Sequence, residues 1–319
     1  MSRRHKEPYL VTVGETLAAL SASRPGPLSL GADVRLGLAG AESNVAVGVS
    51  RLGGSATWIG RVSDDALGDL ILRELRAEGV TTLPVRDPAP TSLLLKERRT
   101  TGHNRTYYYR THSAGSRLVP EDIPEDVVAG AAVLHVTGIT PALGDGPARA
   151  VARAVDIAAD AGVTVSLDIN FRSLLWSEAE ARAALIPLLR RCDLVFAGQH
   201  EAELTVDGAK DPGRLAEGIC HFGPASAVIK RGAEGAYALI DGRSYRQPAI
   251  PVQVHDSVGA GDAFAAGYLA ELLAGEPPER RLRTAALLGA FAVSTAGDWE
   301  GLPRRSELRL LDHHDDNVR

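Results

Sequence analysis

The sequence predicts a three-layer α/β/α fold, in which a mostly parallel central sheet lies between two layers of helices. Strand-like and helix-like runs alternate, most regularly in the second half of the chain. Such alternation favours parallel strands joined by crossover helices. Glycines end several helical runs, as at Gly79 and Gly162. Polar residues gather directly after strand-like runs, which is where open α/β sheets bind ligands.

Each element has its own local signal. Short apolar runs predict strands over 9–13, 56–62, 91–97, 104–111, 132–136, 163–168, 194–197 and 227–230, with a further β-rich run over 249–254. A hairpin turn is expected at 100–103. Apolar residues at helical spacing predict helices over 44–52, 65–78, 148–161, 179–191, 212–222 and 263–274.

Composition excludes several classes of protein. The 319 residues are 45% hydrophobic and 24% charged, which is ordinary for a globular protein with a substantial core. A net charge of -5 and the lack of a long basic block argue against a nucleic-acid partner. No apolar run approaches a membrane span or a secretory signal, so we expect a cytoplasmic protein without a membrane partner. Cys192 and Cys220 are too few for a disulfide framework, and we expect reduced thiols.

One glycine-rich turn carries the strongest chemical signal. Residues 255–264 read HDSVGAGDAF and open a helix-forming run. Backbone N–H groups at such a helix start attract an anion, so the turn that contains Gly259 and Gly261 can form an anion cradle. An acid in that cradle, Asp262, makes sense if it takes a proton from a hydroxyl that attacks phosphorus. Phosphoryl transfer to an alcohol needs both functions, although a plain turn and helix cap can share the pattern.

Polar clusters recur after the strand-like runs, at 138–140, 168–172, 201–203, 231–235 and 256–262. The carboxyl ends of parallel strands share one edge of a sheet, so we expect these clusters to form one site. Their coincidence favours a functional interpretation of Asp262 over a structural one.

Motifs of other enzyme classes are absent from the sequence. It contains no GxxxxGK[ST] loop, no HExxH, no GxSxG and no protein-kinase HRD or DFG set. Neither the turn at 259–264 nor Gly14–Glu15–Thr16 has the glycines of a dinucleotide fingerprint. A nicotinamide-dependent dehydrogenase is therefore disfavoured.

Two signatures resemble the PfkB, or ribokinase-like, family of carbohydrate kinases. The first reads GAESNVA over 40–46 and continues to Gly68, and the second is DSVGAGDAF over 256–264. The resemblance extends from about Tyr9 to Leu311. It implies that residues 1–319 form a single ribokinase-like α/β kinase domain with a small β lid over the sugar. The lid would be built from segments near 15–18, 35–38, 93–97 and 106–110.

Within that family the chain resembles kinases of the sugar acid 2-keto-3-deoxygluconate (KDG). The matching segments are YYYR at 107–110, TGITPAL at 137–143, SLDINFR at 166–172 and GDWEG at 297–301. The resemblance implies transfer of a phosphoryl group from ATP to KDG, which gives 2-keto-3-deoxy-6-phosphogluconate. The charge of the sugar acid also supports this assignment, because a site for a carboxylate needs fixed cations and arginine pairs bidentately with a carboxylate. Arg110 and Arg172 are the candidates, and either could instead serve the ATP phosphates.

The resemblance also implies a role for each matched residue. Asp262 would be the general base beside the anion hole of Gly259, Ala260 and Gly261. The implied sugar-binding residues are Gly40, Asn44, Tyr108, Arg110, Ile139, Arg172 and Asp298. The implied nucleotide-binding residues are Asn170, Lys230, Gly232, Gly235, Gly259 and Gly261. Glu201 would act on Mg²⁺ through water, and a requirement for a monovalent cation is left open.

Some positions depart from the family pattern. The first signature opens with Ala39–Gly40 rather than two glycines. Leu94 stands where a lid tyrosine would face the sugar, Gly198 replaces an asparagine before Glu201, and Ala286 replaces an asparagine near the adenine. These departures put the sugar preference and the hold on the metal in doubt. Exposed strand edges in the lid favour a homo-oligomer.

Two alternatives stay open beside a KDG kinase. One is a PfkB kinase for another sugar, such as fructose or ribose. The other is a non-catalytic sugar or nucleotide sensor on the same scaffold, which the intact turn at 259–262 disfavours.

Overall fold

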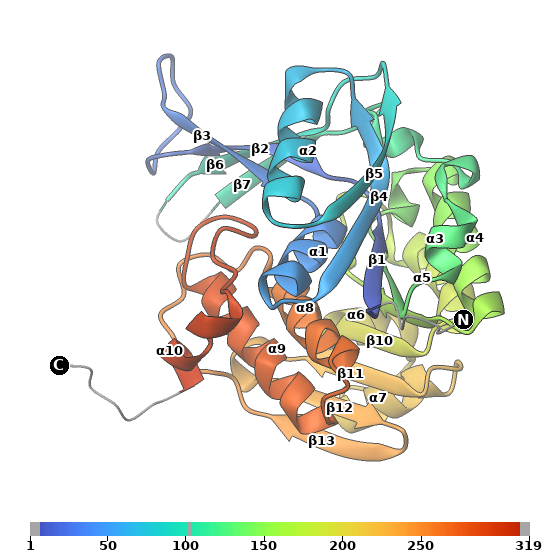
Figure 1. Ribbon diagram of the computed structural model, residues 1–319. Coiled ribbons are helices and arrows are strands. Elements are labelled where there is room, and N and C mark those ends of the chain that lie inside the picture. Colours follow the sequence, from blue (N-terminus) through green and yellow to red (C-terminus); the bar gives the residue numbers. More distant parts are fainter. Residues whose placement is uncertain (1–6, 101–103, 313–319) are drawn as a thin grey trace.

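The computed structural model describes residues 7–100 and 104–312, and its strands form two separate sheets (Figure 1). The large sheet has the order β13-β12-β11-β10-β9-β8-β1-β4-β5. In this sheet β5, β4, β1, β8, β9, β10 and β11 run parallel to one another, and β12 and β13 are antiparallel to their neighbours. The strands are β1 (Tyr9–Val13), β4 (Ser55–Ser63), β5 (Thr81–Asp87), β8 (Val133–Thr137), β9 (Thr164–Asp168), β10 (Leu194–Gly198), β11 (Ser226–Lys230), β12 (Ala236–Ile240) and β13 (Arg243–Gln247). The predicted α/β class with a mostly parallel sheet is confirmed.

Helices cover both faces of the large sheet, so that each face has its own core. Adjacent strand residues point to opposite faces, and Leu10 packs in one core while Val11 packs in the other. The first core contains α1 (Ala41–Arg51), α2 (Ala66–Ala77), α8 (Ala260–Leu273), α9 (Pro278–Val293) and α10 (Arg309–Asp312). The second contains α3 (Glu125–Ala129), α4 (Asp145–Ala161), α5 (Glu178–Leu189), α6 (Gln199–Thr205) and α7 (Pro212–Cys220).

Local chemistry explains where several helices begin and end. Asp65 caps α2 by accepting the N–H of Gly68 at 2.8 Å. Ser177 and Glu180 form a reciprocal capping box at the start of α5. Helix α4 ends at Gly162, whose φ of 72° is left-handed and suits glycine.

The small sheet has the order β3-β2-β6-β7 and projects from one end of the α/β body (Figure 1). Its strands are β2 (Leu17–Ala22), β3 (Val34–Ala39), β6 (Leu93–Arg98) and β7 (Asn104–Tyr109). They overlap the segments that the family resemblance assigns to a lid. Residues 101–103 of the expected hairpin turn lie outside the described residues.

The β-rich run over 249–254 is not a strand, which corrects the sequence prediction. Proline cannot donate a hydrogen bond to a sheet; Pro248 directly precedes this run and Pro251 interrupts it. The strands in this region are β12 and β13, which a turn at Asp241–Gly242 joins with both residues at positive φ. The turn at 256–262 therefore follows an irregular segment rather than a strand.

Short 3₁₀ turns complete the described chain. They are η1 (Gly115–Arg117), η2 (Pro120–Asp122), η3 (Pro141–Leu143), η4 (Gly232–Glu234) and η5 (Arg305–Glu307). Among the described helices, none is long and apolar enough to cross a membrane.

Candidate active site

The carboxyl ends of the parallel strands bring the predicted polar clusters to one edge of the large sheet. Ile139 follows β8, Asn170 follows β9, Glu201 follows β10, and Lys230 ends β11. Because β8 to β11 are consecutive parallel neighbours, these residues lie side by side at the same edge. This edge is where a sheet of this kind binds ligands.

Asp262 lies in the first turn of α8 and is 7% exposed. Its two carboxylate oxygens accept hydrogen bonds from amide side chains, Oδ2 from Asn44 Nδ2 at 2.8 Å and Oδ1 from Asn170 Nδ2 at 3.1 Å. The cap of this helix, Gly259, has a left-handed φ of 74°, and a Cβ there would lie 2.7 Å from the backbone oxygen of Asp298. Glycine therefore lets the turn close against residue 298 and holds the carboxylate beside the free N–H groups of the helix start.

Asp298 is the second acid of this cluster. Asn44 Nδ2 also reaches Asp298 Oδ2, at 3.5 Å, so one amide links the two acids. Burial raises the pKa of Asp298 to about 7, and the charge of Asp262 adds to that effect. The Oδ1 atom of Asn44 is buried and accepts no hydrogen bond from the described residues. It is therefore available to a ligand hydroxyl.

Lys230 provides the cation of the site. Its Nζ donates to Asp168 Oδ2 at 2.6 Å, and it lies 3.2 Å from where a Cβ on Gly261 would stand. Burial alone would lower the pKa of Lys230, but the carboxylates of Asp168, Glu201 and Asp262 outweigh it and raise that pKa. Lys230 is thus a partly buried ammonium group beside the α8 turn.

The loop that follows Lys230 contains two glycines at positions that favour glycine. Gly232 has a φ of 55° and Gly235 a φ of 87°. A Cβ on Gly235 would lie 2.0 Å from the backbone oxygen of Gln247, so a larger residue would push the loop away from β13. The structure thus places two of the predicted nucleotide-binding residues, Gly232 and Gly235, in one tight turn next to Lys230.

Glu201 is held by backbone N–H groups. Its Oε1 accepts from Phe171 at 2.9 Å, and its Oε2 accepts from Gly198 at 2.6 Å. The departure at Gly198 therefore keeps a contact to Glu201 through the backbone. A carboxylate has further lone pairs, so Glu201 can still accept from a water molecule.

The arginines predicted to bind the sugar line one cavity. Arg110, Arg172 and Tyr108 face it together with Phe171 and the segment 173–175. The Arg110 guanidinium lies over the Tyr108 ring, 5.4 Å from its centroid. The Nε atom of Arg110 is buried and has no acceptor among the described residues. It is a donor that an anionic ligand could use.

Tyr108 also lines a second cavity, which reaches the loop of Asp298. Leu94 and Lys96 of β6 contribute to it, as does Asp256 of the turn before α8. Lys96 and Asp256 form an ion pair that ties the small sheet to this turn. Tyr108 lines both cavities, so β7 of the small sheet contributes to the arginine cavity and to the adjoining cavity at Asp298.

Other predicted residues have structural partners. Gly40 precedes α1, and a Cβ there would lie 2.5 Å from the backbone oxygen of Glu15. The N–H of Ile139 donates to Thr137 Oγ1 at 3.0 Å. Ala286 is a buried residue of α9. Among the described residues, no hydrogen bond joins the arginine cluster directly to Asp262.

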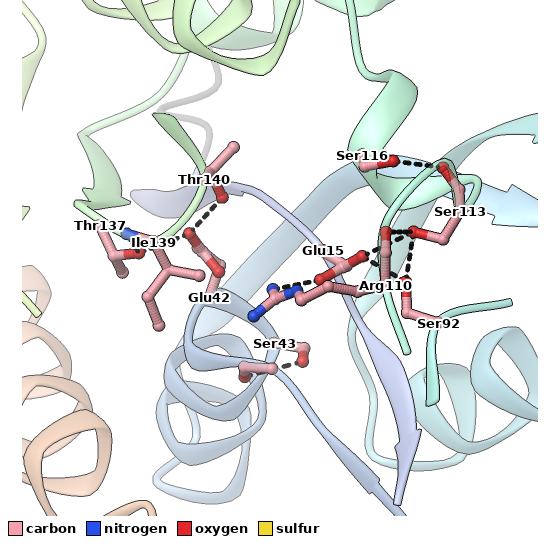
Figure 2. Close-up of polar contacts among 11 residues, drawn as sticks. Glu15, Glu42, Ser43, Ser92, Arg110, Ser113, Ser116, Thr137, Ile139 and Thr140 are labelled. Carbon is pink, nitrogen blue, oxygen red and sulfur yellow. Dashed lines mark hydrogen bonds and ion pairs between the residues drawn. The ribbon is translucent and has the colours of Figure 1, made fainter. Parts of the chain in front are cut away.

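Sequence reasoning missed two buried carboxylates near the site, Glu15 and Glu42 (Figure 2). Glu15 forms an ion pair with Arg110. Oε1 of Glu42 accepts from Thr137 Oγ1 and Thr140 Oγ1, both at 2.7 Å. Glu15, two residues after the first strand, and Glu42, inside the GAESNVA segment, were available as signals, but their partners are remote in the sequence.

Comparisons with known proteins identify the family of the chain. Residues 7–305 match the pfkB family of carbohydrate kinases. A 2-dehydro-3-deoxygluconokinase of Thermoproteus tenax is 37% identical over 308 residues, which cover 95% of this chain and 93% of that protein. The enzyme of the same name from Bacillus subtilis (strain 168) is 37% identical over 303 residues, 93% of each chain.

A solved structure extends the comparison to the fold. The crystal structure of 2-dehydro-3-deoxygluconokinase from Thermotoga maritima superposes with a TM-score of 0.85 at 26% identity, covering 96% of this chain and 98% of that one. The chain belongs to the pfkB family of carbohydrate kinases. The predicted resemblance and the ribokinase-like fold are both confirmed.

Proposed function

We propose that the protein transfers the γ-phosphoryl group of ATP to the 6-hydroxyl of 2-keto-3-deoxygluconate, which is also called 2-dehydro-3-deoxygluconate. The observation that carries the proposal is the buried Asp262 carboxylate, held by Asn44 and Asn170 at the start of α8. A base there can accept the hydroxyl proton while helix N–H groups stabilise the transferred phosphoryl group. The names of the relatives at 37% identity support the choice of sugar acid.

The sugar carboxylate would bind at the arginine cavity. Arg110 and Arg172 line the same cavity, and Arg110 Nε has no acceptor among the described residues. A carboxylate accepting from guanidinium groups gains charge-assisted hydrogen bonds. Tyr108 and Asp298, which line the adjoining cavity, would contact the rest of the sugar. Gly40, Asn44 and Ile139 would complete the sugar site.

The nucleotide would lie along the edge formed by Lys230, Gly232 and Gly235. Lys230 offers a partly buried ammonium group to phosphate oxygens, and Gly259, Ala260 and Gly261 offer backbone N–H groups. Asn170, which holds Asp262, would also face the nucleotide. The reacting hydroxyl and the γ-phosphate would then meet beside Asp262.

The residues of this edge fit a magnesium ion that ATP itself brings. Among the described residues, no three His, Cys, Asp or Glu side chains cluster as a metal site. Asp168 Oδ1 is buried with no donor in the described structure, and Glu201 has lone pairs left for water. Magnesium usually binds through substrate phosphates and one or two carboxylates, so these two acids would hold it through water. When bound, the ion neutralises charge on the phosphates.

A coupled assay of ADP release tests the proposal. Purified protein is given ATP and Mg²⁺ with KDG, fructose or ribose in parallel, with and without added potassium. The proposal expects the highest kcat/KM with KDG. A higher value with fructose or ribose would overturn the sugar assignment, and no sugar-dependent ADP release would favour a non-catalytic sensor. The potassium arm decides whether a monovalent cation is required.

We also propose that the chain forms a homo-oligomer through the small sheet. Tyr107 and Tyr109 of β7 are 41% and 62% exposed, and large exposed aromatic groups on a sheet favour association. Light scattering would give the mass in solution, and a monomer at micromolar concentration would reject this part of the proposal.

A further inference from the structure

Glu15 lies where the chain passes between the two sheets. It follows β1 of the large sheet and precedes β2 of the small sheet. The chain crosses between the sheets at three other places: between β3 and α1, between β5 and β6, and after β7. Glu15 contacts all of them, although it is 3% exposed and carries a charge.

The side chain of Glu15 reaches the last two crossings. Ser92, which precedes β6, donates to Glu15 Oε1. The Ser113 hydroxyl, which follows β7, lies 3.2 Å from the same oxygen and donates to the Arg110 backbone oxygen at 2.7 Å. Ser92 Oγ also lies 2.6 Å from Ser113 Oγ, so the two hydroxyls and the carboxylate form one closed cluster (Figure 2). The other oxygen, Oε2, accepts from Arg110.

Two glycines let neighbouring segments approach Glu15 closely. A Cβ on Gly115 would lie 2.4 Å from Glu15 Cγ, and a Cβ on Gly40 would lie 2.5 Å from the Glu15 backbone oxygen. Gly40 belongs to the crossing between β3 and α1. Gly115 therefore makes room for the Glu15 side chain, and Gly40 lets its segment pass close to the Glu15 backbone.

We propose that Glu15 is a positioning residue for the sugar acid: it anchors Arg110 and joins the four crossings at the base of the small sheet. The inference rests on the proposed function, because it assigns Arg110 to the substrate carboxylate. Because Arg110 Nη2 donates a hydrogen bond to Glu15 Oε2, the guanidinium is held in one orientation. Its Nε and Nη1 atoms are left for the ligand, and Nε has no acceptor among the described residues.

Glu15 has two opposing effects on the binding of the substrate carboxylate. Its negative charge repels a substrate carboxylate, so removing the charge could tighten binding. Its bond to Arg110 fixes a flexible side chain that otherwise loses rotamer entropy when it binds a ligand. Because the guanidinium lies next to Glu15 and only 11% of the Arg110 side chain is exposed, we expect the anchoring to outweigh the repulsion. The sign of the change in KM therefore distinguishes the two effects.

A double-mutant cycle tests the inference, with ADP release as the readout. Glu15→Gln keeps the shape and removes the charge, so it replaces a charge-assisted hydrogen bond by a neutral one and is expected to raise the KM for KDG about tenfold. The KM for ATP should stay within about twofold, because Glu15 does not face the nucleotide edge. In an Arg110→Gln background, Glu15→Gln should add less than about a twofold change.

Controls separate positioning from folding. Ser116→Ala removes a hydrogen bond of 2.8 Å to the Ser113 backbone in the same turn and should leave the KM for KDG unchanged. If Glu15→Gln does not fold, as judged by its melting curve, Ser92→Ala removes one donor to the carboxylate and keeps both charges. It should raise the same KM by a smaller factor.

The outcomes are distinct for the two proposals. An unchanged or lowered KM in Glu15→Gln, or a full additional increase in the Arg110→Gln background, would overturn the role of Glu15 while wild-type turnover of KDG stands. No KDG-dependent ADP release by the wild-type protein would instead reject the proposed function.

Discussion

Replacing Glu42 by glutamine should remove a pH-dependent loss of stability. Glu42 is 1% exposed, and its Oε1 accepts from both Thr137 and Thr140. Burial raises its pKa from 4.5 to about 7; the threonine hydrogen bonds oppose the rise and the charge of Asp262 adds to it. The folded state thus binds a proton more tightly than the unfolded state does.

The sign of the effect follows from linkage. Between the unfolded pKa of 4.5 and the folded pKa of about 7, the folded protein holds the proton longer, so stability falls as pH rises through this window. At one pKa unit per 1.36 kcal/mol, the wild-type protein should lose about 2.5 kcal/mol through Glu42 between about pH 5 and pH 9. Glutamine stays neutral and can accept from both threonines, so the variant should lack this loss.

Urea denaturation at the two pH values measures the effect. Asp298 also has a raised pKa, so the wild-type slope alone does not isolate Glu42. The difference between the unfolding free energies of variant and wild type cancels the contribution of Asp298 and should grow by about 2.5 kcal/mol from low to high pH. A difference that stays constant with pH would refute the reasoning, because Glu42 would then titrate alike in both states.

Three further predictions concern the binding site. Because the pKa of Asp298 is raised to about 7, the KM for KDG should rise as pH falls below about 7, and Asp298→Asn should flatten that profile; a profile that keeps its slope in the variant would contradict this. Lys230→Met should raise the KM for ATP at least about tenfold, through loss of a charge-assisted contact, with a smaller change in the KM for KDG; equal effects on both would argue against a nucleotide role. Gly259→Ala should lower the free energy of unfolding by about 1–2 kcal/mol, because φ is left-handed there and a Cβ meets the Asp298 backbone; urea denaturation with no loss of stability would show that the turn adapts.

Local patterns in the sequence predicted most of the fold. Apolar patterns predicted the parallel strands of the large sheet except β5, and helices such as α2, α4 and α7, whose ends glycines or caps mark. Helix α9 was not predicted. The run over 249–254 was wrongly predicted as β-rich because its β-branched residues were given more weight than Pro251. The Asp241–Gly242 turn between β12 and β13 was overlooked. The prediction that polar residues meet at one edge of the sheet rested on the general rule for α/β sheets rather than on any one residue.

The site was predicted from motifs, but its buried anchors were not. Asp262 and Lys230 belong to patterns that can be recognised in one segment. The role of Glu15 depends on Arg110, which is 95 residues away, and on serines 77 and 98 residues away. Such contacts arise from the pairing of strands in the small sheet, and no local periodicity reports them.

Asp262→Asn tests the central claim most directly, with ADP release and calorimetric KDG binding measured on the same preparation. Loss of the base should lower kcat by about a thousandfold, while the Kd for KDG stays within about threefold because the arginine cavity is intact. A variant that turns over KDG at the wild-type rate would contradict the account.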